Sequence, residues 1–160
     1  MSSVGTTPLP QKLGIKPGVR LAIVGAPAGF ARTLGELPDR VEHTGLSGAP
    51  VDVLIAFHTD ASALRTSFAD HARSVAADGA LWVAWPKRAS GMATDLDENL
   101  LREVGLPTGM VDNKVCAIDE VWSGLRFVVR KENRAAWAAG HSAAPTKGDG
   151  PGPAPARPAA

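Results

Sequence analysis

The stretch that decides the fold is residues 80–131, which contain two apolar segments, ALWVAWPK at 80–87 and KVCAIDEVWSGLRFVV at 114–129. Pro86 ends the first segment as a strand, because proline has no N–H to give to a neighbouring strand. The second segment consists of two apolar runs joined by a link at 119–124 that is short enough for an antiparallel hairpin. The stretch therefore predicts one buried strand and, later in the chain, an antiparallel pair.

Two earlier apolar runs predict two more buried strands. Residues 20–24 form a β-branched run bounded by Gly18 and Gly25, and residues 51–57 are apolar on both faces after Asp52. Strands with two apolar faces are typical of a parallel sheet that is covered by helices on both sides. A shorter run at 41–44 predicts one further strand.

Helices are predicted between these strands. One ends before Pro38, and a second begins at Thr59 or Asp60 and ends at the Asp-Gly pair at 78–79. A third follows Asp95, which has capping-box spacing to Glu98 and is interpreted as a helix cap in preference to a catalytic acid. Alternating strands and helices predict an α/β fold: a single three-layer domain with a mostly parallel sheet and a C-terminal antiparallel hairpin.

Composition sets the expected domain limits and cellular context. The 160 residues predict one domain at 11–137, a flexible N-terminus at 1–10 and a disordered Ala/Gly/Pro-rich tail at 138–160. With a net charge of +1, the chain has no large positive electrostatic field that would attract nucleic acid or an anionic membrane, so neither is expected as a partner. A single cysteine and the absence of a secretory signal or long apolar run predict a cytoplasmic protein.

The loop after the first strand, GAPAG at 25–29, has two glycines that would let a backbone approach a phosphate. Pro27 stands where a dinucleotide fingerprint needs its second glycine, so the match to that fingerprint is incomplete. Gly25, Gly29 and Glu42 are the candidate cofactor-binding residues, with Glu42 placed to hold a ribose hydroxyl at the end of the second strand. The alternative interpretation is a plain tight turn.

A second candidate site lies at the turns of the 80–131 stretch. If the strand leading to Asp119 is parallel to the strand ending at Trp85, the loops that follow them share one sheet edge and form a crevice. The candidate ligand-binding residues there are Trp85, Lys87, Ser90, Asp119, Trp122 and Ser123. They offer a cation, hydroxyl donors and flat apolar walls, which suit a small polar or anionic ligand. The alternative is that Trp122 plugs the hairpin end, while Asp119 and Ser123 satisfy the backbone of the turn.

Catalytic residues remain unknown from the sequence. Cys116 lies in a predicted strand, where burial would make it inert, and no histidine stands in a recognisable order with a serine or cysteine. His58 and His71 have no companion at metal-ligand spacing, so no metal site is expected. No protein partner can be inferred.

Several strings carry a resemblance to a known family. They are WPK at 85–87, SG at 90–91, TDL at 94–96, VDNKVCAIDE at 111–120 and WSGLRF at 122–127. On these strings the chain resembles the actinobacterial domain-of-unknown-function 3052 family over roughly residues 8–131. That resemblance implies no activity and no catalytic residues.

More distantly, the order of strands and helices resembles the Rossmann-like scaffold of class I methyltransferases. In that family a glycine-rich first loop and an acidic second strand end hold S-adenosylmethionine (SAM). This chain is one strand-helix unit short, its first strand ends in Val24 where an acidic residue is usual, and Pro27 interrupts the glycines. The expected function is a small-ligand-binding or regulatory module without its own catalysis and without a cofactor. The alternative is a degenerate SAM-dependent methyltransferase-like enzyme.

Overall fold

The structure is a computed structural model, and it describes residues 8–46 and 48–143. Within these residues the chain forms a six-stranded sheet of order β2-β1-β3-β4-β6-β5. The strands are β1 (Arg20–Val24), β2 (Glu42–His43), β3 (Val51–Phe57), β4 (Val75–Pro86), β5 (Met110–Ala117) and β6 (Trp122–Val129). The α-helices are α1 (Leu9–Lys12), α2 (Phe30–Leu34), α3 (Ala61–Ser74), α4 (Glu98–Gly105) and α5 (Arg134–Ala143). Single 3-10 turns are η1 (Arg88–Ser90), η2 (Leu106–Thr108) and η3 (Lys131–Asn133).

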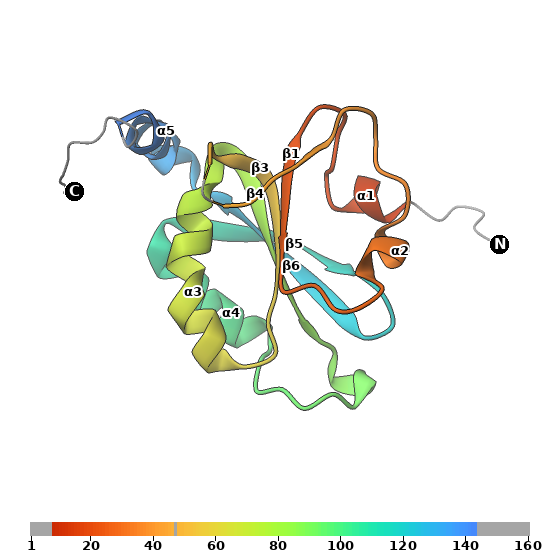
Figure 1. Cartoon of the computed structure of the whole chain (residues 1–160). Helices are drawn as coiled ribbons and strands as arrows, with labels where there is room; N and C mark the ends of the chain where they lie inside the picture. Colours follow the sequence, from red (N-terminus) through yellow and green to blue (C-terminus); the bar gives the residue numbers. More distant parts are fainter. Residues whose placement is uncertain (1–7, 47, 144–160) are drawn as a thin grey trace.

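Helices cover the sheet on both faces, with α3 and α4 on one side and α1 and α2 on the other (Figure 1). Strands β2, β1, β3 and β4 pair in parallel, whereas β6 is antiparallel to both β4 and β5. Because β6 returns between β4 and β5, these two strands run in the same direction. The predicted α/β domain with a mostly parallel sheet and a C-terminal hairpin is confirmed.

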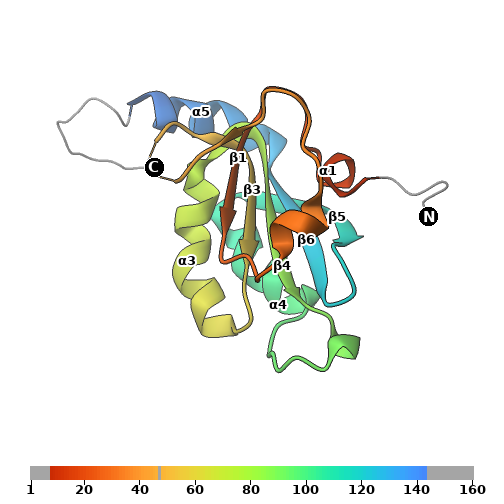
Figure 2. The same cartoon turned by 45° about the vertical axis from the view of Figure 1, so that its right-hand side comes forward.

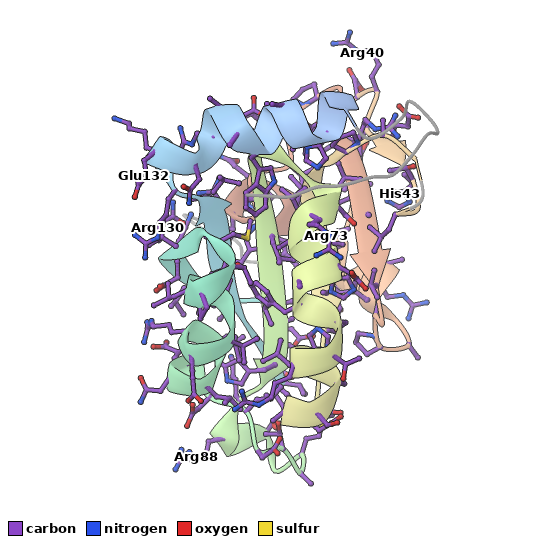
Figure 3. The ribbon with its side chains drawn as sticks, turned by 90° about the vertical axis from the view of Figure 1, so that its left-hand side faces the viewer. Arg40, His43, Arg73, Arg88, Arg130 and Glu132 are labelled. Atoms are coloured by element: carbon purple, nitrogen blue, oxygen red, sulfur yellow. The ribbon has the colours of Figure 1, made fainter. Side chains whose placement is uncertain are left out.

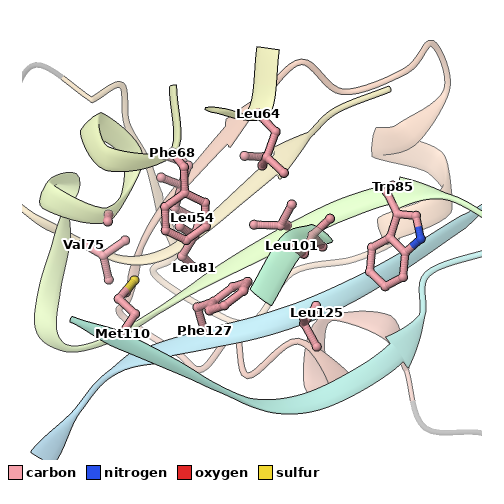
Figure 4. Packing of buried hydrophobic residues seen from close by; sticks show 14 of the residues in the cluster. Leu54, Leu64, Phe68, Val75, Leu81, Trp85, Leu101, Met110, Leu125 and Phe127 are labelled. Carbon is pink, nitrogen blue, oxygen red and sulfur yellow. The ribbon is translucent and has the colours of Figure 1, made fainter. Parts of the chain in front are cut away.

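The two faces of the sheet are packed very differently. On the α3/α4 face, Leu64 and Phe68 of α3 and Leu101 of α4 pack against Leu125 and Phe127 of β6, and all five are at most 1% exposed (Figure 4). Phe68 and Phe127 meet edge to face, with ring centroids 5.2 Å apart. This face holds a continuous core under one long and one medium helix.

The opposite face is covered by short segments. Helices α1 and α2 have only four and five residues, and the chain between them adds Leu13 and Ile15 to the core. The indole N–H of Trp82 in β4 donates to the Leu13 carbonyl oxygen at 2.9 Å, so a buried polar atom anchors the loop after α1 to the sheet. The view in Figure 2 shows α1 and α2 beside the strands on this face.

The predicted end of the second helix at 78–79 is wrong. Helix α3 ends at Ser74, and β4 begins at once with Val75, which pairs with Val51 of β3. A Cβ added to Gly79 would lie 2.6 Å from the Asp52 carbonyl oxygen. The glycine therefore allows close backbone approach inside a strand, a role that the sequence does not distinguish from a helix stop.

The cap predicted for α4 is also wrong. Asp97 is the N-cap of α4 and accepts the Leu100 N–H at 2.9 Å. Asp95 instead accepts the Ala61 N–H of α3 at 2.8 Å. Asp95 is thus a helix cap, but of a helix that lies more than thirty residues earlier in the chain.

The described helices extend beyond the predicted domain limits of 11 and 137. Helix α1 begins at Leu9, and α5 continues past Trp137 to Ala143. The Trp137 indole N–H donates to the Val75 carbonyl oxygen at 3.0 Å, which fastens α5 across the start of β4. The rest of the predicted termini, residues 1–7 and 144–160, lies outside the described residues. In the described part of the chain, no helix is long and apolar enough to span a bilayer.

Candidate functional site at the carboxyl edge of the sheet

The loops that follow β1, β3, β4 and β5 lie at one edge of the sheet, which we call the carboxyl edge. Two of them are in direct contact, because the Lys87 N–H donates to the Val121 carbonyl oxygen at 2.7 Å. The loop after β4 and the hairpin turn between β5 and β6 are therefore neighbours. This is the shared edge that the 80–131 stretch predicts.

Polar side chains at these turns are satisfied locally. Asp119 Oδ1 accepts the backbone N–H groups of Val121 and Trp122, both at 2.8 Å. Ser90 Oγ donates to the Lys87 carbonyl oxygen at 2.7 Å and accepts the Met92 N–H at 3.1 Å. Asp119 thus has the turn-stabilising role that was the alternative to ligand binding, and Ser90, for which no such role was predicted, has one as well.

The two candidate tryptophans lie on opposite faces of the sheet. Trp85 belongs to the core under α3 and α4, whereas Trp122 packs on the α1/α2 face, with its ring 5.1 Å from that of Phe57. They are only 7% and 6% exposed. Ser123 pairs with Trp85 across the β4–β6 ladder. The structure therefore brings the six candidates to one edge but does not gather their side chains around one cavity.

A pocket of about 430 Å³ does open at this edge, on the α4 side of Trp85. Its lining residues are Trp85, Pro86, Arg88, Met92, Thr94, Asp95, Leu96 and Asp97. Thr94 Oγ1 donates to the Thr59 carbonyl oxygen at 2.6 Å, so the loop after β4 is tied to the turn after β3. Arg88 stands at the end of the molecule below α3 and α4 (Figure 3). Of this lining the sequence identified Trp85 and, as an alternative cation to Lys87, Arg88; the others meet only once the loop folds back.

The glycine-bearing loop closes tightly against β3. Gly25 has a φ of +72°, and a Cβ there would lie 3.1 Å from the Phe57 carbonyl oxygen. Gly29 has a φ of +84° and precedes α2, which has just five residues. The two glycines are thus required by backbone conformation, and the helix that follows is too short to present a strong N-terminal dipole.

Glu42 lies away from this loop. Strand β2 pairs with the first residues of β1, Glu42 opposite Arg20 and His43 opposite Leu21, whereas the loop follows the last residue of β1. Figure 3 shows His43 and Arg88 near opposite ends of the molecule. The Glu42 carboxylate is also 3.2 Å from the Arg20 guanidinium. The structure therefore does not bring Glu42 together with Gly25 and Gly29.

These positions test the fit of SAM, which the scaffold implies. The arrangement in which an acidic second strand end and a glycine-rich loop hold the cofactor together is not present, because Glu42 is at the wrong end of β1 and Pro27 lacks an N–H. The residues of the first loop and second strand do not fit SAM in that manner. We derive no methyl-transfer step from them.

His58, at the end of β3, is a buried residue of this edge that the sequence analysis did not select. It is 8% exposed, and its Nε2 has no hydrogen-bond partner among the described residues. Burial, reinforced by His71 with its ring centroid 5.8 Å away, lowers the pKa of His58 to about 4, although Asp60 opposes the shift. His58 is therefore neutral near pH 7. Its position after a predicted strand did not mark it as a site residue, because a lone histidine more often has a structural role.

Cys116 is 6% exposed, and burial raises its thiol pKa. A thiol in this state is a poor nucleophile, which agrees with the sequence-based expectation. Within residues 8–46 and 48–143, no group of three or more His, Cys, Asp or Glu side chains is arranged to hold a metal ion.

The fold matches known structures although the sequence matches none. No family model matches the chain, so its resemblance to the domain-of-unknown-function family stays a prediction. No curated protein matches it either. A SAM-dependent methyltransferase from Aquifex aeolicus superposes with a TM-score of 0.52 at 16% identity, over 74% of this chain and 87% of that chain. The magnesium protoporphyrin IX methyltransferase of Synechocystis PCC 6803, with bound SAH, gives a TM-score of 0.51 at 13% identity, over 71% and 74%.

A methyltransferase-type fold is therefore shown. A putative methyltransferase from Thermoplasma acidophilum adds a TM-score of 0.50 at 11% identity, over 82% of this chain and 77% of that chain. At such identities the likeness shows the scaffold and not the chemistry. The domain is a shortened class I methyltransferase fold.

Proposed function

We propose that this chain is a degenerate SAM-dependent methyltransferase-like protein, with its ligand position at the carboxyl edge between the loop after β1 and the turn after β3. The observation that carries the proposal is the fold match to methyltransferase structures, over 74% of this chain and 87% of the Aquifex aeolicus chain. In open α/β sheets, ligands bind outside the carboxyl ends of the strands. The Gly25 loop and the His58 turn occupy that position.

Three features of the first half of the domain indicate that its ligand position is degenerate. Glu42 is paired with Arg20 at the far end of β1, Pro27 removes a donor from the loop, and α2 has one short turn of helix. Each of these weakens the hold on a nucleoside ligand without closing the edge. The expected property is loose binding, with no residue assigned to catalysis.

A nuclear magnetic resonance titration with S-adenosylhomocysteine (SAH) tests the proposal. We expect saturable shifts of the Gly25 and Gly29 amide signals, because both residues lie in the loop that follows β1 at the carboxyl edge. NAD is the control nucleotide, and it should not shift them at the same concentration. Shifts confined to other parts of the chain would contradict the proposal. So would the absence of shifts at SAH concentrations up to about 1 mM, where a Kd of that size corresponds to about 4 kcal/mol of binding free energy.

A second candidate is a small-ligand-binding or regulatory module without its own catalysis, located in the cytoplasm. The pocket of about 430 Å³ beside Trp85 supports it, since its lining combines the Arg88 guanidinium with the carboxylates of Asp95 and Asp97. Small zwitterionic amino acids, whose carboxylate suits Arg88 and whose ammonium suits the two aspartates, provide the test in a thermal-shift screen. Arg88→Gln should abolish any stabilisation that they give, whereas Lys131→Gln, at an exposed position in η3, should not. Equal stabilisation of the Arg88→Gln variant would exclude the pocket.

A further inference from the structure

Three basic residues lie on the α1 face of the sheet, where α1 contacts the β5–β6 hairpin. Lys114 Nζ donates to the Lys12 carbonyl oxygen at 3.4 Å, and Lys12 Nζ donates to the Ala117 carbonyl oxygen at 3.5 Å. Arg126 of β6 is the direct cross-strand partner of Lys114. Helix α1 and the hairpin are about a hundred residues apart in sequence, so this cluster exists only in the folded chain.

The cluster lacks a balancing negative charge among the described residues. Five ion pairs are formed within residues 8–46 and 48–143, and none includes Lys12, Lys114 or Arg126. The guanidinium of Arg126 donates only to the Asn113 side-chain oxygen, at 3.3 Å. Like charges directly opposite each other in an antiparallel pair are destabilising.

Burial sharpens this imbalance. Arg126 is half-buried, and the loss of solvent lowers its pKa, so an anion bound beside it would favour its charged form. Cys116 is on the same face of β5, and Lys12, Lys114 and Lys87 each act to lower the pKa of its thiol, against the larger effect of burial. The three lysines therefore all lie within electrostatic reach of Cys116. Lys87 extends the positive region to the carboxyl edge.

We propose that Lys12, Lys114 and Arg126 form a binding site for a phosphate-type oxyanion, either free or as the phosphate group of a small ester. A guanidinium offers two parallel N–H donors to such a group, and the two ammonium groups add charge without fixed geometry. The ligand supplies the negative charge that the cluster lacks. The site is independent of methyl transfer, and it is local, as the net charge of +1 requires.

Calorimetric titration of the full chain at low ionic strength tests the site, with inorganic phosphate in one arm and phenyl phosphate in the other. We expect saturable binding with a Kd below about 1 mM. Arg126→Gln should weaken it by about tenfold or more and Lys114→Gln by about fivefold, since each removes a charge-assisted hydrogen bond. Lys131→Gln removes an exposed charge elsewhere and should change the Kd by less than about twofold. Tighter binding of phenyl phosphate would identify an ester as the ligand class, and tighter binding of inorganic phosphate would identify the free ion.

Loss of binding must be separated from loss of folding. In phosphate-free buffer, Lys114→Gln should unfold at the same temperature as the wild type or higher, because it removes a like-charge pair. A midpoint lowered by more than about 4 °C would show that Lys114 serves the structure, and would overturn the proposal. Equal weakening by Lys131→Gln, or no saturable binding of either probe, would overturn it as well.

Discussion

The two halves of the domain differ in how much of the methyltransferase scaffold they retain. In the second half, β4, β5 and β6 have twelve, eight and eight residues and contribute eight of the seventeen buried residues of the core under α3 and α4. In the first half, β2 has two residues and α2 has five. The longest strands therefore lie in the second half, and the shortest elements lie in the half that contains the loop after β1.

This difference bears on the proposed loose binding, because the two halves have different structural roles. The carboxyl edge exists only while the strands keep their order in the sheet. The buried residues of the second half stabilise that order. A tight cofactor site needs an acidic group near the first loop, and that requires a longer β2. The two-residue β2 places Glu42 opposite the first residue of β1, at the far end from that loop.

The largest effect on the unfolding free energy is expected when a buried phenylalanine is replaced, and each half of the domain offers one such residue. Phe127 is fully buried in β6, and Phe30 is 4% exposed in α2, and each makes one edge-to-face contact with another phenylalanine. Phe127→Ala should cost about 4 kcal/mol of unfolding free energy, because the strands around it cannot collapse into the cavity. Phe30→Ala should cost about 2 kcal/mol, since the short segment around it can relax. Urea denaturation measures both, and an equal or larger loss for Phe30→Ala would contradict the contrast between the halves.

The next effect concerns His58, which lies where the two halves meet. Its pKa is about 4 in the folded chain and about 6.5 when unfolded. Above pH 6.5 the imidazole is neutral in both states, and its full contribution to stability is present. Between about pH 6.5 and pH 4 only the unfolded chain takes up the proton, so the unfolding free energy falls as the pH falls.

The expected loss over that window is on the order of 2 kcal/mol. His58→Gln should flatten the pH dependence, leaving the smaller part that His71 contributes through its own lowered pKa. His43→Gln, at an exposed position in β2, is the matched control and should leave the slope unchanged. If His58→Gln retains the wild-type slope in denaturation series from pH 7 to pH 4, His58 is not the group responsible.

A smaller effect is expected where the loop after β4 is tied to α3. Asp95→Ala removes the acceptor for the Ala61 N–H and should cost about 1 kcal/mol, the usual value of a helix cap. Asp78→Ala, at an exposed position in β4, should cost less than about 0.5 kcal/mol. Hydrogen exchange of the Ala61 amide gives a local readout, which should accelerate in Asp95→Ala alone. Unchanged protection there would show that Asp95 does not hold the two loops together.

The sequence predicted the strands well because their signal is local. The limits of β1 and β3 match the apolar runs at 20–24 and 51–57, and the hairpin follows from two runs with a short link. Gly79 and Asp95 misled for a shared reason. A glycine needed for close approach resembles a helix stop, and a cap for a distant helix resembles a cap for the next one, so only tertiary contacts separate these roles.

The candidate site was predictable only in part, for a related reason. Parallel strands deliver their following loops to the same edge, so the neighbourhood of Lys87 and the 118–121 turn followed from topology. The sides on which Trp85 and Trp122 face, and the ion pair of Glu42, depend on register. The cluster of Lys12, Lys114 and Arg126 brings together α1 and the β5–β6 hairpin, which are distant in the sequence, so no local sequence pattern predicts it.

Calorimetric titration with SAH is the most direct test of the claim that the first half has kept the ligand position and lost the tight grip. The expected result is saturable binding with a Kd between about 10 μM and about 1 mM, or roughly 7 to 4 kcal/mol of affinity. A Kd below about 10 μM would contradict the claim, because it would require a complete cofactor site. If SAH gives no binding heat even at a concentration several-fold above about 1 mM, the claim that the ligand position is kept would be wrong, because the carboxyl edge would then bind no such ligand.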